Sequence, residues 1–147
     1  MKFVYSRQNH SVGDNFYHIQ FCTKYRYNMF TKFKYKNLIE ACIRRACKKH
    51  NIIIKALSIM PDHVHMIAAL PTNLCLNRAL QLIKGYSSYL FFKNHPKARL
   101  RYPRGHLWSR GKFRSSIGYV NVPDSIAYVL NQEETKLASL IAGNLGL

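Results

Sequence analysis

Two histidines separated by one residue are the most distinctive chemical feature of the chain. His63 and His65 follow the turn Pro61-Asp62 and open an otherwise apolar run that ends at Leu70. Side chains alternate between the two faces of a β-strand, so a strand here points both imidazoles to one side. Neutral imidazole is the commonest metal ligand, and two imidazoles at a fixed separation form half of a metal site. A His-x-His pair can also lie on a solvated sheet face, so the metal interpretation depends on further ligands.

Carboxylates are scarce in this chain, which has only six acidic residues. Nucleases and transposases that hold two metal ions need several converging carboxylates, and only Asp62 adjoins the histidine segment. A carboxylate nuclease using Asp62 with Glu134-Thr135-Lys136 has the right residue types, but the two halves lie far apart in the sequence and offer too few acids. A one-metal site built mainly from neutral ligands fits the composition better.

A line of polar residues four positions apart marks the last predicted helix. The line comprises Asp124, Tyr128, Gln132 and Lys136. Residues at this spacing stack along one edge of a helix. In most proteins a tyrosine one turn before a glutamine is an ordinary surface pair. Beside a His-x-His strand, Gln132 could supply the third ligand oxygen, and Tyr128 would then lie one turn from the metal.

Hydrophobic periodicity predicts the elements that must position these residues. Strands are expected at residues 16–23, 51–60, 63–70 and 112–120, and helices at 33–50, 74–93 and 123–140, with a slack tail over 142–147. The order strand, helix, strand, strand, helix, strand is that of the split βαβ, or ferredoxin-like, arrangement. We therefore expect an α+β fold in which a four-stranded antiparallel sheet carries helices on one face and an appended C-terminal helix. Residues 1–147 are expected to form one domain, with the histidines on a central strand.

The charge balance indicates a polyanionic partner. The chain has 23 Lys and Arg residues against six acids, a net charge of +17, which favours nucleic acid as the partner. A membrane surface is the competing interpretation, but no apolar run reaches the roughly 20 residues of a spanning helix. The N-terminus lacks the apolar core of a signal peptide. We therefore expect a cytoplasmic protein.

The cysteines agree with that compartment. They are Cys22, Cys42, Cys47 and Cys75, with no Cys-x-x-Cys pair among them. This scatter suggests neither a zinc ribbon nor a disulfide framework. Reduced core residues are expected instead.

Two segments combine basic and aromatic residues. The first contains Lys24, Tyr25 and Arg26, and the second is the Pro-containing loop 94–111, which carries Arg104, Trp108 and Arg110. Cationic side chains can hold phosphates while aromatic rings stack on bases. An ordinary solvated edge explains the first segment nearly as well. The loop has no core duty in this interpretation, so it can present its arginines and its aromatic plane to DNA.

Gly85 lies inside the second predicted helix. A glycine there costs about 1 kcal/mol relative to alanine, which close packing or the close approach of a ligand would explain. Its neighbour Lys84 joins the candidates for DNA binding.

The segment Met60-Pro61-Asp62-His63-Val64-His65 resembles the histidine, hydrophobic, histidine motif of the HUH single-tyrosine transposases. That family moves the smallest insertion sequences as single-stranded DNA and includes the REP-associated tyrosine transposases. Further blocks resemble family blocks in the family order: Tyr17-His18, residues 22–26, residues 81–85, Leu107-Trp108-Ser109 and residues 126–132. The combination of the histidine motif with a late Tyr-x-x-x-Gln is the most specific part of the likeness, which extends over most of the chain.

The resemblance implies a DNA transposase that cuts and rejoins single-stranded transposon ends through a 5′-phosphotyrosine intermediate. Tyr128 would be the nucleophile, and His63, His65 and Gln132 would hold one Mg²⁺ or Mn²⁺ ion. The implied partner is single-stranded DNA with a hairpin at each transposon end, with no membrane and no small-molecule cofactor. The family also implies a homodimer in which the tyrosine helix of one subunit can complete the histidine site of the other. The segment Asn121-Val122-Pro123 could act as a hinge for this exchange.

Alternatives to this interpretation stay open at the sequence. A domesticated relative that cuts chromosomal repeat hairpins would use the same residues. A non-catalytic nucleic-acid-binding module would explain the charge but not the coincidence of the histidines with the late Tyr-x-x-x-Gln. The nucleophile is also open, since Tyr86, Tyr89 and Tyr119 are alternatives whose default role is packing or base stacking.

Overall fold

The computed structural model describes residues 15–118 and 121–144 of the chain. Its elements are β1 (Phe16–Thr23), the 3₁₀ helix η1 (Lys24–Arg26), α1 (Phe33–Lys49), β2 (Ile53–Ile59), β3 (His63–Ala69), α2 (Leu76–Asn94), the 3₁₀ helix η2 (Pro96–Leu100), β4 (Trp108–Ile117) and α3 (Val122–Asn144). The strands and helices follow one another in the predicted order, and α3 is the appended helix.

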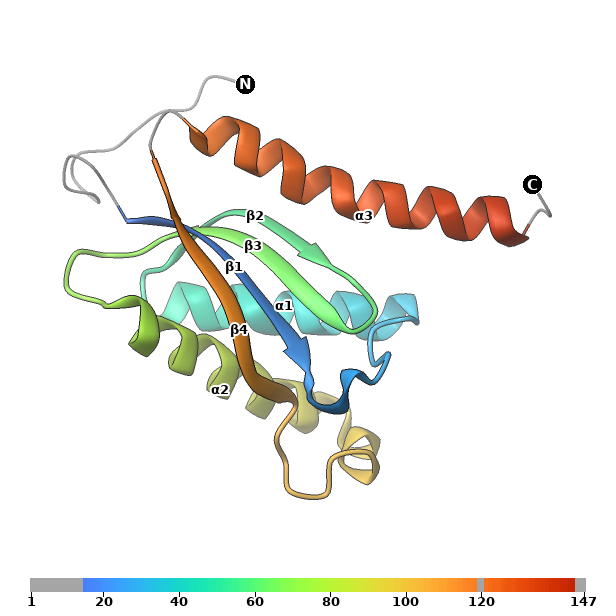
Figure 1. Ribbon diagram of the computed structural model, residues 1–147. Helices are drawn as coiled ribbons and strands as arrows, with labels where there is room; N and C mark the ends of the chain where they lie inside the picture. Colours follow the sequence, from blue (N-terminus) through green and yellow to red (C-terminus); the bar gives the residue numbers. More distant parts are fainter. Residues whose placement is uncertain (1–14, 119–120, 145–147) are drawn as a thin grey trace.

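The strands form one four-stranded sheet in the order β2-β3-β1-β4. Every neighbouring pair is antiparallel, and β3 lies between β2 and β1. Helices α1 and α2 lie along one face of the sheet, and α3 lies along the opposite face (Figure 1). The ferredoxin-like prediction is therefore confirmed, and the two histidines stand at the start of an inner strand.

The side chains of β3 alternate between two separate apolar clusters. Val64 and Met66 belong to the larger cluster, which α1 and α2 cover. Ile67 and Ala69 point the other way and pack in a smaller cluster with Val129 of α3. His63 and His65 have odd residue numbers, like Ile67 and Ala69. Both histidines therefore lie on the α3 side of the sheet, as the period of two predicts.

Strand β4 begins earlier than predicted, at Trp108 instead of Lys112. Trp108 pairs with Thr23 of β1, is only 7% exposed, and meets the ring of Phe21 edge-on at 4.6 Å between centroids. Its indole N–H donates a hydrogen bond of 3.0 Å to the hydroxyl of Ser87. The expectation that Trp108 is presented on a loop without a core duty is therefore wrong. The local sequence does not show that the core supplies partners for both the ring and its N–H.

The helices differ from the expectations in two places. Helix α3 continues to Asn144, so Ala142 to Asn144 are helical instead of part of a slack tail. At Gly85, an added Cβ would meet no atom within 4 Å, so close packing does not require glycine there. Across the described ranges, no helix is both long and apolar enough to cross a membrane.

The cysteines divide between core and surface. Cys42 and Cys47 are buried, as expected, whereas Cys75 is exposed and Cys22 is half-buried. Burial raises the pKa of the Cys42 thiol to about 11 and that of Cys47 to about 12. The prediction of core cysteines therefore holds for the two on α1 and is wrong for Cys75.

Candidate active site

The histidine pair lies at the end of β3 that follows the Pro61-Asp62 turn. The rings of His63 and His65 meet edge-on with 5.0 Å between their centroids. The strand fixes this separation because β3 is hydrogen-bonded to a neighbour on each side: His65 faces Gln20 of β1 and Ser58 of β2. The sheet thus presents two imidazoles in one direction with little freedom to separate.

The carboxylate of Asp62 binds two neighbours. One oxygen lies 2.6 Å from Nδ1 of His63, and the other accepts a hydrogen bond of 2.9 Å from Nε of Arg26. Burial alone would raise the pKa of this carboxyl, but hydrogen bonds from His63 and Arg26 outweigh burial and lower the pKa. The ionised carboxylate favours the proton on Nδ1 of His63, which leaves Nε2 as the ligating nitrogen.

A third histidine supports His65. Nε2 of His18, on β1, lies 3.3 Å from Nδ1 of His65, and the two rings are stacked with 5.6 Å between centroids. His65 is only 6% exposed. Burial, with smaller contributions from the neighbouring His63 and His18, lowers the pKa of His65 to about 4. His65 is therefore neutral at pH 7, and its contact through Nδ1 leaves Nε2 to bind a ligand.

The sequence interpretation did not include His18 among the site residues. The split βαβ order places β1 beside β3, and the period of two places His18 on one face with Phe16 and Gln20. The sequence therefore indicates the face of the sheet on which His18 lies. It does not indicate the register between β1 and β3, and this register brings His18 close to His65.

This donor set suits a single divalent cation. Each imidazole is held through Nδ1 by a second group, the arrangement that fixes the tautomer and orientation of metal-binding histidines. No trio of His, Cys, Asp or Glu within the described part of the chain is arranged to hold a metal ion. A metal at this pair therefore needs ligands of another kind, such as an amide oxygen, a phosphate oxygen or water.

Tyr128 reaches the cluster from α3. Its ring stands edge-on to that of His18, with 6.3 Å between centroids, and the side chain is 55% exposed. Gln132 lies one turn further along α3 and is half-buried. In the described part of the molecule Gln132 makes no hydrogen bond to either histidine of β3. The structure therefore brings Tyr128, through His18, into a described contact with the cluster, and it gives no such contact for Gln132.

An anchor fixes α3 over the sheet. The carboxylate of Glu133 forms an ion pair with Lys36 of α1 and accepts a hydrogen bond of 3.3 Å from the backbone N–H of Ile59, at the end of β2. The alternative nucleophiles Tyr86 and Tyr89 are on α2, which covers the opposite face of the sheet. Tyr119 lies outside the described residues.

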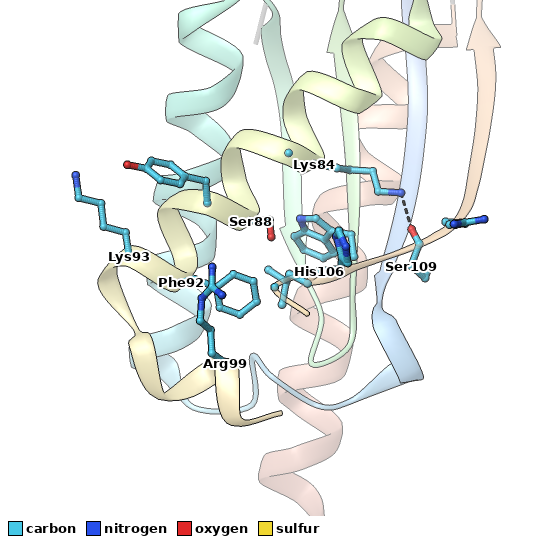
Figure 2. A pocket seen from close by; sticks show the side chains of 13 residues that line it. Lys84, Ser88, Phe92, Lys93, Arg99, His106 and Ser109 are labelled. Atoms are coloured by element: carbon cyan, nitrogen blue, oxygen red, sulfur yellow. Dashed lines mark hydrogen bonds between the residues drawn. The ribbon is translucent and has the colours of Figure 1, made fainter. Parts of the chain in front are cut away.

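A basic groove of about 650 Å³ runs between α2 and the start of β4, here called the α2–β4 groove. Its cationic side chains are Lys84, Lys93, Arg99 and Arg110, and its rings include Tyr89, Phe92, His106 and Trp108. Figure 2 shows Lys84 reaching across the groove to the backbone carbonyl of Ser109, to which it donates a hydrogen bond of 2.5 Å. Three of the predicted DNA-binding residues therefore line one surface, although Trp108 offers it little exposed area.

Most of the remaining predicted DNA-binding residues line a second cavity. This Tyr25 pocket, of about 330 Å³, is formed by Lys24, Tyr25, Tyr102, Pro103, Arg104 and His106. His106 lines both cavities, so the two adjoin. Arg26 is the exception among the predicted residues, because its guanidinium is bound to Asp62.

The family model described as "Transposase IS200 like" matches residues 11–132. The chain belongs to this transposase family. The predicted kinship with the single-tyrosine transposases is thereby confirmed. This IS200-like transposase is 25% identical over 120 residues to the transposase for insertion sequence element IS200 of Salmonella typhimurium, which covers 80% of this chain and 78% of that protein. It is 23% identical over 93 residues to the ISDra2 transposase TnpA of Deinococcus radiodurans, covering 63% of this chain and 66% of that one.

Two solved structures share the fold of this IS200-like transposase. One is a Deinococcus radiodurans R1 crystal structure described as that of a transposase, with a TM-score of 0.65, 22% identity, and coverage of 90% of this chain and 98% of that one. The other is a REP-associated tyrosine transposase bound to a REP hairpin, with a TM-score of 0.58, 14% identity, and coverage of 88% and 70%. These likenesses support the architecture of sheet and helices described above.

Proposed function

We propose that this IS200-like transposase cuts and rejoins single-stranded DNA at transposon ends through a covalent bond to Tyr128. The observation that carries the proposal is the meeting of Tyr128 with the three-histidine cluster on the α3 side of the sheet. A binding module would need the basic grooves but not this cluster. The chemistry suited to a tyrosine beside an imidazole site is nucleophilic attack on a phosphodiester.

We propose further that His63 and His65 bind one Mg²⁺ or Mn²⁺ ion through Nε2, and that the amide oxygen of Gln132 is the third protein ligand. Gln132 is one turn from Tyr128 on α3, and its side chain is half-buried. Such an ion supplies Lewis-acid polarisation of a phosphate oxygen. The residues of the chain hold the phosphate and the nucleophile in place.

The step at Tyr128 balances without any further reactant. The phenolic oxygen attacks the scissile phosphorus, its proton leaves to solvent, and a bond from tyrosine to the 5′-phosphate forms as the P–O3′ bond breaks. The leaving 3′-oxygen takes up a proton and becomes a hydroxyl. The 3′-hydroxyl of another strand can reverse the reaction, because the phosphotyrosyl bond retains the energy of the original linkage. Strand transfer therefore needs no ATP.

The proposed DNA partner is a hairpin that leads into a single-stranded segment. The α2–β4 groove offers Lys84, Lys93 and Arg99 for the hairpin phosphates, and the net charge of +17 favours such binding. The shared fold with a transposase bound to a REP hairpin supports this choice. We also propose a homodimer, the oligomeric state that the family resemblance implies, in which each active site is formed within one chain. Light scattering on purified protein tests the dimer.

The decisive experiment uses labelled single-stranded DNA from both flanks of the gene, incubated with protein and Mg²⁺ or Mn²⁺ and resolved on a denaturing gel. The wild-type protein should form a covalent adduct that chelation of the metal prevents. Tyr128→Phe should form none, because it lacks the attacking oxygen, and His65→Ala should lose at least 100-fold in rate. Tyr89→Phe is the matched control, since Tyr89 is also an exposed tyrosine on a helix.

Each contrary result has a definite meaning. An adduct that persists in Tyr128→Phe assigns the nucleophile to another tyrosine. Tight DNA binding by the wild-type protein without any adduct or cleavage would replace the transposase proposal with that of a binding module. An adduct that forms equally well after chelation would remove the metal from the proposal.

A further inference from the structure

The Tyr25 pocket is not used by the chemistry at Tyr128. It lies between η1 and the segment 102–106, next to the turn that precedes the histidines. Its lining combines one exposed ring with two flexible cations, Lys24 and Arg104. This composition suits a flat aromatic group that carries a negative charge.

The backbone presents Tyr25 in an uncommon conformation. Tyr25 has φ 64° and ψ 9°, and the next residue, Arg26, has φ 56°. Both lie in the left-handed region, which non-glycine residues seldom adopt, and two in succession require that the surroundings impose it. The result is a tyrosine that is 63% exposed. Strained residues of this kind concentrate at ligand-binding sites.

Contacts within the chain surround this segment. The hydroxyl of buried Tyr102 donates a hydrogen bond of 2.9 Å to the backbone carbonyl of Lys24. The backbone N–H of Lys24 donates a hydrogen bond of 2.8 Å to the carbonyl of Leu107. The ring of Tyr25 lies nearly parallel to that of Tyr102, at 9° and 6.3 Å between centroids, and 5.4 Å from that of Tyr27. The Tyr25 ring therefore stands beside two other rings, and the Lys24 ammonium lies 5.4 Å from its centroid.

The pocket is also coupled to the histidine site. The guanidinium of Arg26 binds Asp62, and the same carboxylate contacts His63. The backbone N–H of Thr23 donates to the carbonyl of Asp62 at 2.9 Å. On its other side, the pocket shares His106 with the α2–β4 groove. The pocket thus adjoins the groove through His106 and the Asp62 turn through Thr23 and Arg26, which flank Lys24 and Tyr25.

We propose that the Tyr25 pocket binds one unpaired nucleotide of single-stranded DNA, between the hairpin and the scissile phosphate. The base stacks on Tyr25, while Lys24 and Arg104 contact the flanking phosphates. This role rests on the proposed function, because it assumes a single strand that runs toward the histidines. By holding one base at a fixed place, this site sets the number of nucleotides between the hairpin and the cleaved phosphodiester bond.

A scan with 2-aminopurine tests the proposal. This fluorescent base is placed at successive positions of the single-stranded segment, and its fluorescence is measured in the Tyr128→Phe background without metal, so that no cleavage occurs. One position should be quenched on binding, because stacking on an aromatic ring quenches this fluorophore. Tyr25→Gly should abolish that quench and weaken DNA binding by about 5- to 150-fold, the range for loss of one stacked base.

The choice of variants separates the ring from the fold. Tyr25→Gly removes the ring but suits a positive φ, so circular dichroism should show a folded protein. Tyr25→Phe keeps the ring and should retain the quench at the same position. Tyr86→Ala is the control, since Tyr86 lies in a different basic patch, where the Lys49 ammonium is 4.3 Å from the centroid of its ring.

The proposal is overturned if no position is quenched, or if the quench survives in Tyr25→Gly. A loss of affinity that is equal in Tyr25→Gly and Tyr25→Phe would also overturn it. Failure of the proposed function shows separately, as a missing adduct with the wild-type protein on the same oligonucleotides with metal. The stacking result is independent of that outcome because it is measured without cleavage.

Discussion

His18 contacts the most deeply buried imidazole of the site, that of His65. It contacts Nδ1 of His65 through one ring nitrogen and stands beside the ring of Tyr128. It therefore contacts both the proposed ligand and the proposed nucleophile. We therefore predict that His18 is a positioning residue, which sets the tautomer of His65 and the angle of its ring.

Replacing His18 should weaken metal binding before it affects folding. In His18→Ala the ring of His65 loses its partner, so we expect a 10- to 100-fold weaker affinity for Mn²⁺, the usual consequence of removing such a partner. Titration of Mn²⁺ followed by electron paramagnetic resonance measures this without any reaction. His18→Gln, which keeps a polar group near Nδ1, should recover part of the affinity.

His50→Ala provides the matched control for that measurement. His50 follows the end of α1, on the other side of the sheet, so its removal should leave Mn²⁺ affinity unchanged. Equal Mn²⁺ affinity in His18→Ala and the wild-type protein would show that His18 does not orient His65.

Helix α2 contains a glycine that its packing does not require. An added Cβ at Gly85 meets open space, and alanine is favoured over glycine in a helix interior by about 0.8–1.0 kcal/mol. Gly85→Ala should therefore raise the free energy of unfolding by about 1 kcal/mol, as measured by urea denaturation. Because Gly85 lines the α2–β4 groove, the same change should weaken hairpin binding if DNA approaches the backbone closely.

Gly105→Ala should have the opposite effect on stability. Gly105 has φ +76°, and an added Cβ would stand 3.3 Å from the guanidinium of Arg99. Both features disfavour alanine, so the free energy of unfolding should fall by about 1 kcal/mol or more.

A loss of stability in Gly85→Ala would contradict the first of these two predictions. It would mean that α2 is more crowded around Gly85 than its described neighbours indicate.

The patterns that predicted the elements were local, and the features they missed depend on contacts between distant segments. The period of two in β3 predicted which face the histidines share, and the order of the elements predicted that β3 is an inner strand. The start of β4 at Trp108 was missed because its burial depends on Phe21 and Ser87, which are distant in sequence. The contact of His18 with His65 was missed for the same reason, since it depends on strand register.

The whole chain brings its own tyrosine helix to its own sheet. Glu133 ties α3 to Lys36 and Ile59, and Val122 and Val129 of this helix are buried in the smaller core cluster. Tyr128 and His18 then meet within one chain. A helix held by apolar contacts and a half-buried ion pair is not free to exchange quickly, so this arrangement predicts an active site completed in cis.

Mixing two inactive variants tests that arrangement. His65→Ala retains the tyrosine and Tyr128→Phe retains the histidines, so a dimer of the two contains one intact site only if the helix acts on the partner's sheet. The arrangement described here predicts no covalent adduct after co-expression and purification of the mixed dimer. Wild-type protein mixed with the double variant should form adduct in proportion to its wild-type content. Restored adduct in the first mixture would mean that α3 leaves its own sheet and crosses to the partner, and Glu133→Ala, which releases the anchor, should then increase the restored activity.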